Sequence, residues 1–194
     1  MSDKSTDAQK AILDAFWRLY RHKPLDQIMV TEVTRAAHVH RSTFYRHFLH
    51  LEDALRCIEE NTVEEIATSL EDVLGVEEGI EAVRLSEAFE CIVQRFAEKV
   101  FYLRLRGQLS FEELLAERTA PAFRQLLRPN LSDSVCDYLC ALFLSMLLTS
   151  MSYAYELSVS DEELVAHQTT LGVFLGTVLP TLKDQVESEK GEES

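Results

Sequence analysis

Residues 31–48, TEVTRAAHVHRSTFYRHF, constrain the fold more than any other part of this 194-residue chain. Their apolar spacing predicts a short helix, a tight turn and a second short helix from about residue 40 to residue 48. The small residues Ala36 and Ala37 would let the two helices cross closely, while Val39 and Phe44 would fix the angle between them. The segment therefore has the proportions of a helix-turn-helix, whose second helix keeps one face free.

Helices are expected on both sides of this segment. Thr6-x-x-Gln9 is a capping-box pattern, which predicts a first helix that starts at Thr6 and ends before Pro24. Thr31 is expected to be the N-cap of the next short helix, because its hydroxyl can accept a hydrogen bond from a free amide. A fourth helix should span about residues 51–74, with acidic residues in its first turn.

The rest of the chain also has helical patterns, at roughly 80–106, 111–127, 133–157 and 161–182. Six glycines and four prolines in the whole chain leave little material for a structure with many turns. No alternating strand pattern competes with the helical one. The sequence therefore predicts an all-α fold, with a three-helix helix-turn-helix module at the N-terminus and a larger helical domain after it.

Charge divides the chain in a similar way. Residues 1–56 hold nine Lys and Arg against seven Asp and Glu, a net +2, and five of the six histidines. Residues 57–194 hold ten against 26, a net −16, so the total of −14 conceals a mildly basic N-terminal part. A surface that binds phosphates needs only a local excess of positive charge, and the acidic remainder is compatible with that role.

The stretch RSTFYRHF at 41–48 is the most distinctive part of the helix-turn-helix. Together with Glu52 and Leu55 behind it, this stretch resembles the TetR family of transcription regulators (TetR/AcrR-like), in a form typical of a Gram-positive-type subgroup. The resemblance covers about residues 8–55 and includes Val39 in the turn. It implies a TetR-type DNA-binding domain over residues 6–66, with the helix-turn-helix at about 29–48, and a C-terminal ligand-binding (regulatory) and dimerisation domain over 67–186.

Three positions depart from the family pattern. His38 stands where the family usually has a glycine, so a histidine would have to adopt a left-handed backbone conformation. His40 replaces a small helix-capping residue and can cap only weakly. Leu51 replaces a lysine, which removes a phosphate contact and lowers the expected affinity for DNA.

The resemblance also implies which residues contact DNA. Arg41, at the start of the second helix, could pair with O6 and N7 of a guanine. Ser42 and Thr43 could reach base edges or phosphates, Arg46 could serve either purpose, and Tyr45 and His47 would contact the backbone. Thr31 could hold a phosphate near the start of the first short helix. The alternative is that these seven side chains are merely solvated residues on a small helical bundle.

Residues 138–155 form an eighteen-residue stretch without a formal charge, which is long enough to cross a membrane. Acidic flanks, the lack of a basic cluster and four internal hydroxyl residues favour a buried helix between this subunit and a partner instead. Gly172-x-x-x-Gly176, in the last predicted helix, would allow close helix packing and is assigned to a dimer interface. The resemblance implies the same, since TetR-like proteins typically dimerise through their last two long helices.

Candidate ligand or metal residues are less clear. Six residues could line an effector cavity but fit surface or packing roles better, so no ligand residue is assigned: Tyr102, Arg104, Arg106, Tyr153, Tyr155 and His167. Four scattered cysteines fit reduced thiols in a cytoplasm, and Cys136 and Cys140 lack further ligands for a metal. We expect neither a cofactor nor a metal.

The sequence thus predicts a cytoplasmic homodimer that binds a pseudo-palindromic operator in double-stranded DNA and represses transcription until a small molecule relieves it. An activator of the same fold, or a helical interaction protein that does not bind DNA, remains an alternative. No phosphate-binding loop, metal-spaced His/Glu pair or nucleophile elbow is present in the sequence, so an enzyme is not expected.

Overall fold

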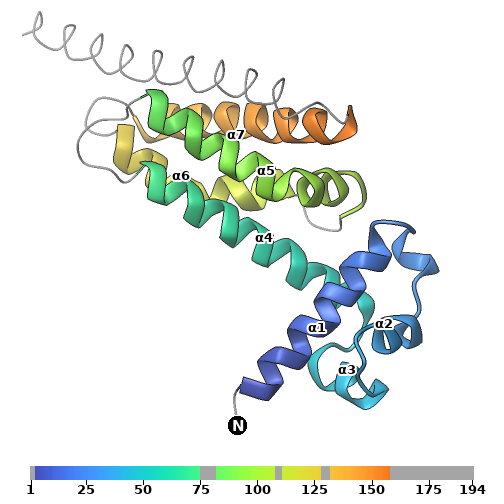
Figure 1. Cartoon of the computed structure of the whole chain (residues 1–194). Coiled ribbons are helices and arrows are strands. Elements are labelled where there is room, and N and C mark those ends of the chain that lie inside the picture. Colours follow the sequence, from blue (N-terminus) through green and yellow to red (C-terminus); the bar gives the residue numbers. More distant parts are fainter. Residues whose placement is uncertain (1–2, 75–81, 108–110, 128–131, 158–194) are drawn as a thin grey trace, which may run out of the picture. The chain divides into compact units, whose positions relative to one another are not determined.

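A computed structural model describes residues 3–74, 82–107, 111–127 and 132–157. The regular secondary structure of these residues is helical and includes no strand, which confirms the predicted all-α class (Figure 1). In chain order the helices are α1 (Asp3–Tyr20), α2 (Val30–Ala36), α3 (Arg41–His47), α4 (Leu51–Leu74), α5 (Ala82–Arg106), α6 (Phe111–Leu127) and α7 (Asp133–Glu156). A short 3-10 helix, η1 (Leu25–Gln27), lies between α1 and α2.

The chain divides into two compact units. The first, called here the N-terminal unit, comprises Met1–Asn61 with Leu105–Leu109, and the second, called the helical body, comprises Thr62–Arg104 with Ser110–Ser194. Helices α4 and α5 therefore each contribute residues to both units.

The core of the N-terminal unit is built from the apolar faces of α1, α2, α3 and the first part of α4. Ile12 and Phe16 of α1, Val33 of α2, Phe44 of α3 and Leu55 of α4 are all fully buried. The apolar stripe predicted for the first helix and the inward position of Phe44 are thus confirmed. This core holds the two helices of the helix-turn-helix against α1.

Two helix starts differ from the prediction. Helix α1 begins at Asp3 rather than at Thr6, so the proposed capping threonine lies inside the helix. The N-cap of α2 is Met29, and Thr31 is already helical. The reason is that the Glu32 carboxylate accepts the Met29 backbone N–H at 2.9 Å, so the glutamate rather than the threonine satisfies the free amide at this end.

The turn between α2 and α3 takes the left-handed conformation expected of it. His38 has φ = 55° and is the one non-glycine residue with positive φ in the described parts of the chain. Histidine tolerates this region better than most residues, although less easily than glycine. His40 is the N-cap of α3 but makes no side-chain cap bond, so even the weak capping expected of it is not seen. At the next turn, the Asp53 carboxylate accepts the His50 N–H at 2.9 Å and so caps the start of α4.

The helical body contains the rest of α4 with most of α5, α6 and α7, whose bounds agree closely with the predicted ranges. Arginine side chains join these helices: Arg118 of α6 binds Glu64 and Glu71 of α4, and Arg124 of α6 binds Asp137 of α7 at 2.7 Å. The helix predicted at 161–182 lies outside the described residues.

Helix α7 is the apolar segment that the sequence analysis expected to be buried. Within the described residues it is the single helix long and apolar enough to cross a membrane, a property that core helices share, and 39% of its most apolar stretch is buried. One face packs in the body through eight buried residues: Cys136, Cys140, Phe143, Leu144, Leu147, Leu148, Met151 and Ala154. The expected burial is therefore confirmed for this face of the helix. The opposite face exposes a second set of large apolar residues, Val135, Tyr138, Leu142, Met146, Tyr153 and Leu157.

Candidate DNA-binding interface

Helix α3 has a buried inner side and an exposed outer side. Phe44 is fully buried, and its ring lies 5.7 Å from that of Phe48, which is 5% exposed. Of the residues predicted to contact DNA, four on α3 are exposed: Arg41, Ser42, Tyr45 and Arg46. The two phenylalanines therefore anchor the helix from behind, and its hydrophilic side faces solvent.

The other three predicted contact residues are placed differently. Thr43 is half-buried, and Thr31 is exposed in the first turn of α2. His47 is also half-buried, and its Nε2 atom is buried without a hydrogen-bond partner in the described structure. In this orientation of the ring, Nε2 is therefore not accessible to a phosphate.

Arg41 and Tyr45 lie one helical turn apart and contact each other on the exposed side of α3. The Arg41 Nη2 atom donates to the Tyr45 hydroxyl at 3.0 Å. The guanidinium carbon also lies 5.4 Å from the centre of the tyrosine ring, within the range of a cation–π interaction. The Tyr45 ring in turn meets the buried Phe44 ring edge to face, at 5.5 Å and 89°.

Positive charge on α3 is not neutralised within the described parts of the chain, because neither Arg41 nor Arg46 has a carboxylate partner there. Lys23, by contrast, binds the Glu32 carboxylate at 2.7 Å. The hydrogen bond from Lys23, followed by that from the Met29 amide, lowers the pKa of Glu32 below its usual value. Lys23 therefore supports the start of α2, while the α3 arginines keep their charge for an external anion.

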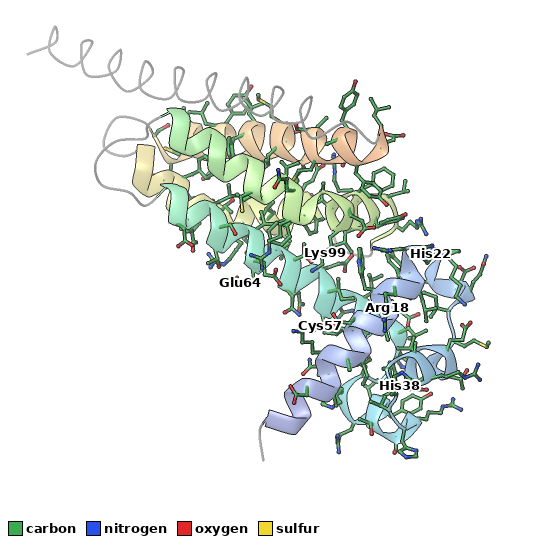
Figure 2. The ribbon with its side chains drawn as sticks, viewed as in Figure 1. Arg18, His22, His38, Cys57, Glu64 and Lys99 are labelled. Carbon is green, nitrogen blue, oxygen red and sulfur yellow. The ribbon has the colours of Figure 1, made fainter. Side chains whose placement is uncertain are left out.

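A shallow groove of about 450 Å³ lies elsewhere in the N-terminal unit. Arg18 and His38, both labelled in Figure 2, line this groove with Asp14 and Trp17 of α1 and with Ala36 and Ala37 at the end of α2. Arg18 also donates to the Ala36 carbonyl at 3.5 Å. The groove contains no α3 residue, and nothing in the sequence pattern indicated it.

Sequence reasoning also missed a contact between the ends of two helices. The Tyr20 hydroxyl donates to the Arg106 carbonyl at 2.7 Å, and Arg106 Nη1 donates to the Tyr20 carbonyl at 3.4 Å. The Tyr20 side chain thus caps the last carbonyl of α5, and the Arg106 side chain caps the last carbonyl of α1. Burial is the main cause that raises the pKa of Tyr20 to about 12. Arg106, considered as a cavity residue from the sequence, therefore serves a packing role here.

The other possible cavity residues of the described body also contact protein groups. Arg104 binds Glu112 and donates to the Leu148 carbonyl at 3.0 Å. The Tyr155 hydroxyl lies 3.4 Å from that of Tyr102, and this hydrogen bond is the largest cause that raises the pKa of Tyr155 to about 12. His167 lies outside the described residues. Cys136 and Cys140 are buried in the core, and the described parts contain no group of three residues that could hold a metal ion.

No family model and no curated protein sequence matches the chain. Solved structures do match it over most of its length. A proposed TetR-family transcriptional regulator from Syntrophomonas wolfei superposes with a TM-score of 0.67 and 18% identity, over 89% of this chain and 96% of that one. The chain has the fold of TetR-family regulators.

Two other solved structures with this TetR fold carry different regulatory descriptions. The TetR family repressor AlkX from Dietzia sp., implicated in biodegradation of n-alkanes, has a TM-score of 0.59 and 16% identity, over 89% of this chain and 95% of AlkX. The dihydroxyacetone kinase operon activator DhaS has a TM-score of 0.59 and 18% identity, over 88% of this chain and 97% of DhaS. The same fold therefore serves both a repressor and an activator.

Proposed function

We propose that this protein is a TetR-family, sequence-specific DNA-binding transcription regulator. The observation that carries this proposal is the outer side of α3, where Arg41, Ser42, Tyr45 and Arg46 are exposed over buried phenylalanines. A rigid helix with unneutralised arginines and hydroxyl groups suits the major groove of duplex DNA. We assign DNA binding to residues 6–66 and regulation with dimerisation to residues 67–186.

The individual contacts follow from chemistry and exposure. Arg41 is assigned to the N7 and O6 acceptors of a guanine, and Ser42 and Thr43 to base edges or nearby phosphates. Tyr45 and His47 are assigned to the DNA backbone. Two residues complete the set: Arg46 contacts a base or a phosphate, and Thr31 holds a phosphate with its exposed hydroxyl.

A homodimer is part of the proposal. One seven-residue recognition helix reads few base pairs, whereas a two-fold dimer places a second copy on the next turn of the operator. The exposed apolar face of α7 offers a surface that a second copy could bury. Gly172 and Gly176, outside the described residues, are assigned to the same interface.

The dimer assignment can be tested by placing a bulky side chain at the small-residue position. Gly176→Leu should prevent close helix approach, so light scattering should report a monomer where the wild-type protein is a dimer. Gly176→Ala, which adds one methyl group, is the matched control and should remain dimeric. A dimer of wild-type affinity in the leucine variant would contradict this interface.

We further propose that the protein acts in the cytoplasm as a repressor, relieved by a small molecule that binds the C-terminal domain. The repressor AlkX and the activator DhaS share this fold equally well, so activation stays as the alternative. A reporter gene behind the selected operator distinguishes the two. Expression should fall when the protein is supplied if it is a repressor, and rise if it is an activator.

DNA binding itself is tested by selection from a pool of random duplexes with the full-length protein. We expect enrichment of a pseudo-palindromic sequence, and an affinity that falls steeply as the salt concentration rises because phosphate contacts release counterions. A variant carrying Arg41→Ala and Arg46→Ala together is the control and should enrich nothing. Failure of the folded wild-type protein to enrich any sequence would overturn the proposed function.

A further inference from the structure

We propose that Tyr45 determines specificity by holding Arg41 in the orientation in which its guanidinium reads a guanine. This inference rests on the proposed function and adds to it. Tyr45 would be more than a phosphate contact, because it would link the position of the DNA backbone to the reading of one base.

The contact between the two side chains already exists in the protein without DNA. Arg41 Nη2 donates to the Tyr45 hydroxyl at 3.0 Å, and the guanidinium stands 5.4 Å from the ring centre. An arginine side chain has many rotamers, and selecting one of them on binding costs entropy. Two contacts from one tyrosine restrict these rotamers before DNA arrives, so less entropy is lost when a base is bound.

Tyr45 is itself fixed by the core. Its ring meets the Phe44 ring edge to face at 5.5 Å, and Phe44 is fully buried. Tyr45 remains 43% exposed, so the side that does not face Phe44 is open to a ligand. The guanidinium is therefore connected through two successive ring contacts to a fully buried residue of the N-terminal core.

The hydrogen-bonding groups needed for DNA remain available in this arrangement. Nη2 carries two hydrogens, of which one is donated to Tyr45, and the other can act together with Nη1 on N7 and O6 of a guanine. The structure gives Arg41 no other polar partner among the described residues. The Tyr45 hydroxyl accepts from Arg41 and keeps its own proton for a phosphate oxygen. A continuous chain of hydrogen bonds from a phosphate through Tyr45 and Arg41 to a guanine can thus form while the Arg41–Tyr45 hydrogen bond stays in place.

This arrangement predicts a result that a simple phosphate contact does not. If Tyr45 only bound phosphate, Tyr45→Phe would weaken the binding of every duplex by the same factor. If it orients Arg41, the loss should be concentrated on duplexes that carry the guanine, and the variant should discriminate less between guanine and an altered base.

The experiment uses the full-length protein and the duplex selected by the wild-type protein from a random pool. Each guanine is replaced in turn by 7-deazaguanine, which lacks the N7 acceptor, and affinities are measured by fluorescence anisotropy at one salt concentration. At the guanine read by Arg41, the wild-type protein should lose about tenfold in affinity. Arg41→Ala should be insensitive to that replacement, and Tyr45→Phe should lose only about threefold.

Arg46→Ala is the matched control on the same helix. It should bind all duplexes more weakly but keep the full sensitivity at the guanine read by Arg41, because the Tyr45 side chain has its hydrogen bond and its cation–π contact with Arg41 and not with Arg46. Circular dichroism checks that each variant is folded. Full wild-type sensitivity in Tyr45→Phe would overturn the inference, as would an Arg41→Ala variant that remains sensitive at every guanine. Either result would leave the proposed function supported, provided that the wild-type protein enriches a sequence from the random pool. If the wild-type protein enriches no sequence, the proposed function itself is contradicted.

Discussion

Helix α3 and the helical body use their arginines in opposite ways. In the body, every arginine whose side chain the structure describes is paired with a carboxylate: Arg95 with Glu65, Arg104 with Glu112, Arg118 with Glu64 and Glu71, and Arg124 with Asp137. On α3, Arg41 and Arg46 face solvent and have no carboxylate partner among the described residues.

This difference explains how a chain with a net charge of −14 can present a surface for an anion. Five acidic side chains of the body are matched with its four paired arginines, and these ion pairs join its helices to one another. The α3 arginines stay unmatched, so their charge and donors are available to phosphates and bases. Local pairing, more than total charge, decides which arginines can bind a ligand.

The largest expected effect concerns the core behind the α3 arginines. Phe44→Ala should lower the free energy of unfolding by about 3–5 kcal/mol, because it removes a fully buried ring and leaves a cavity. Urea titration followed by far-ultraviolet circular dichroism measures this change. Phe44→Leu, which retains most of the volume, should cost clearly less. A Phe44→Ala protein with the wild-type midpoint would show that this core does not support α3.

Removal of one unpaired arginine of α3 should lower the affinity for DNA but leave the stability of the protein unchanged. Arg41→Ala should weaken binding to the selected operator by about 1–3 kcal/mol, since it removes the base contact proposed for this residue. Its unfolding midpoint should stay close to that of the wild-type protein, because Arg41 is exposed. Fluorescence anisotropy and thermal melting measure the two quantities. Unchanged operator affinity would remove Arg41 from the set of DNA contacts.

The sequence was most informative where a structural feature depends on neighbouring residues. The apolar spacing in α1 and the Phe44 anchor could be predicted because one helix periodicity determines them. The strained backbone at His38 followed from a single position in the turn. The predicted start of α2 was wrong. Whether Thr31 or Glu32 supplies the capping side chain depends on geometry that the spacing of residues alone does not determine.

The helices after α3 could be predicted, but the tertiary partners of their side chains could not. Helical periodicity gives the length and inner face of α5, yet it does not indicate that Arg106 would cap the end of α1 at Tyr20, 86 residues earlier. The same holds for Arg118, whose two glutamate partners lie on α4. Such contacts arise from tertiary packing, so the sequence alone gave no reliable assignment of cavity residues.

A matched arginine of the body should show the reverse behaviour of Arg41. Arg118→Ala should lower the melting temperature by at most a few degrees, because its ion pairs with Glu64 and Glu71 are partly open to solvent. Operator affinity should be unchanged. Arg118→Lys keeps the charge but loses the bidentate geometry of the guanidinium. Its melting temperature should therefore lie between those of the wild-type and Arg118→Ala proteins. A loss of operator affinity in the folded Arg118→Ala protein would show that matched arginines also contribute to binding.

The smallest effect should appear as a dependence of stability on pH in the N-terminal unit. The hydrogen bonds from Lys23 and the Met29 amide hold the pKa of Glu32 below its usual value of 4.5. A carboxyl group whose pKa is lowered by folding stabilises the folded state above its unfolded pKa, and this contribution is lost as the pH falls through the folded pKa. Glu32→Gln should therefore lose less stability than the wild-type protein between about pH 5 and pH 3. Parallel acid titrations of the two proteins at fixed salt measure the difference, and identical slopes would mean that the Lys23 contact contributes nothing to folding.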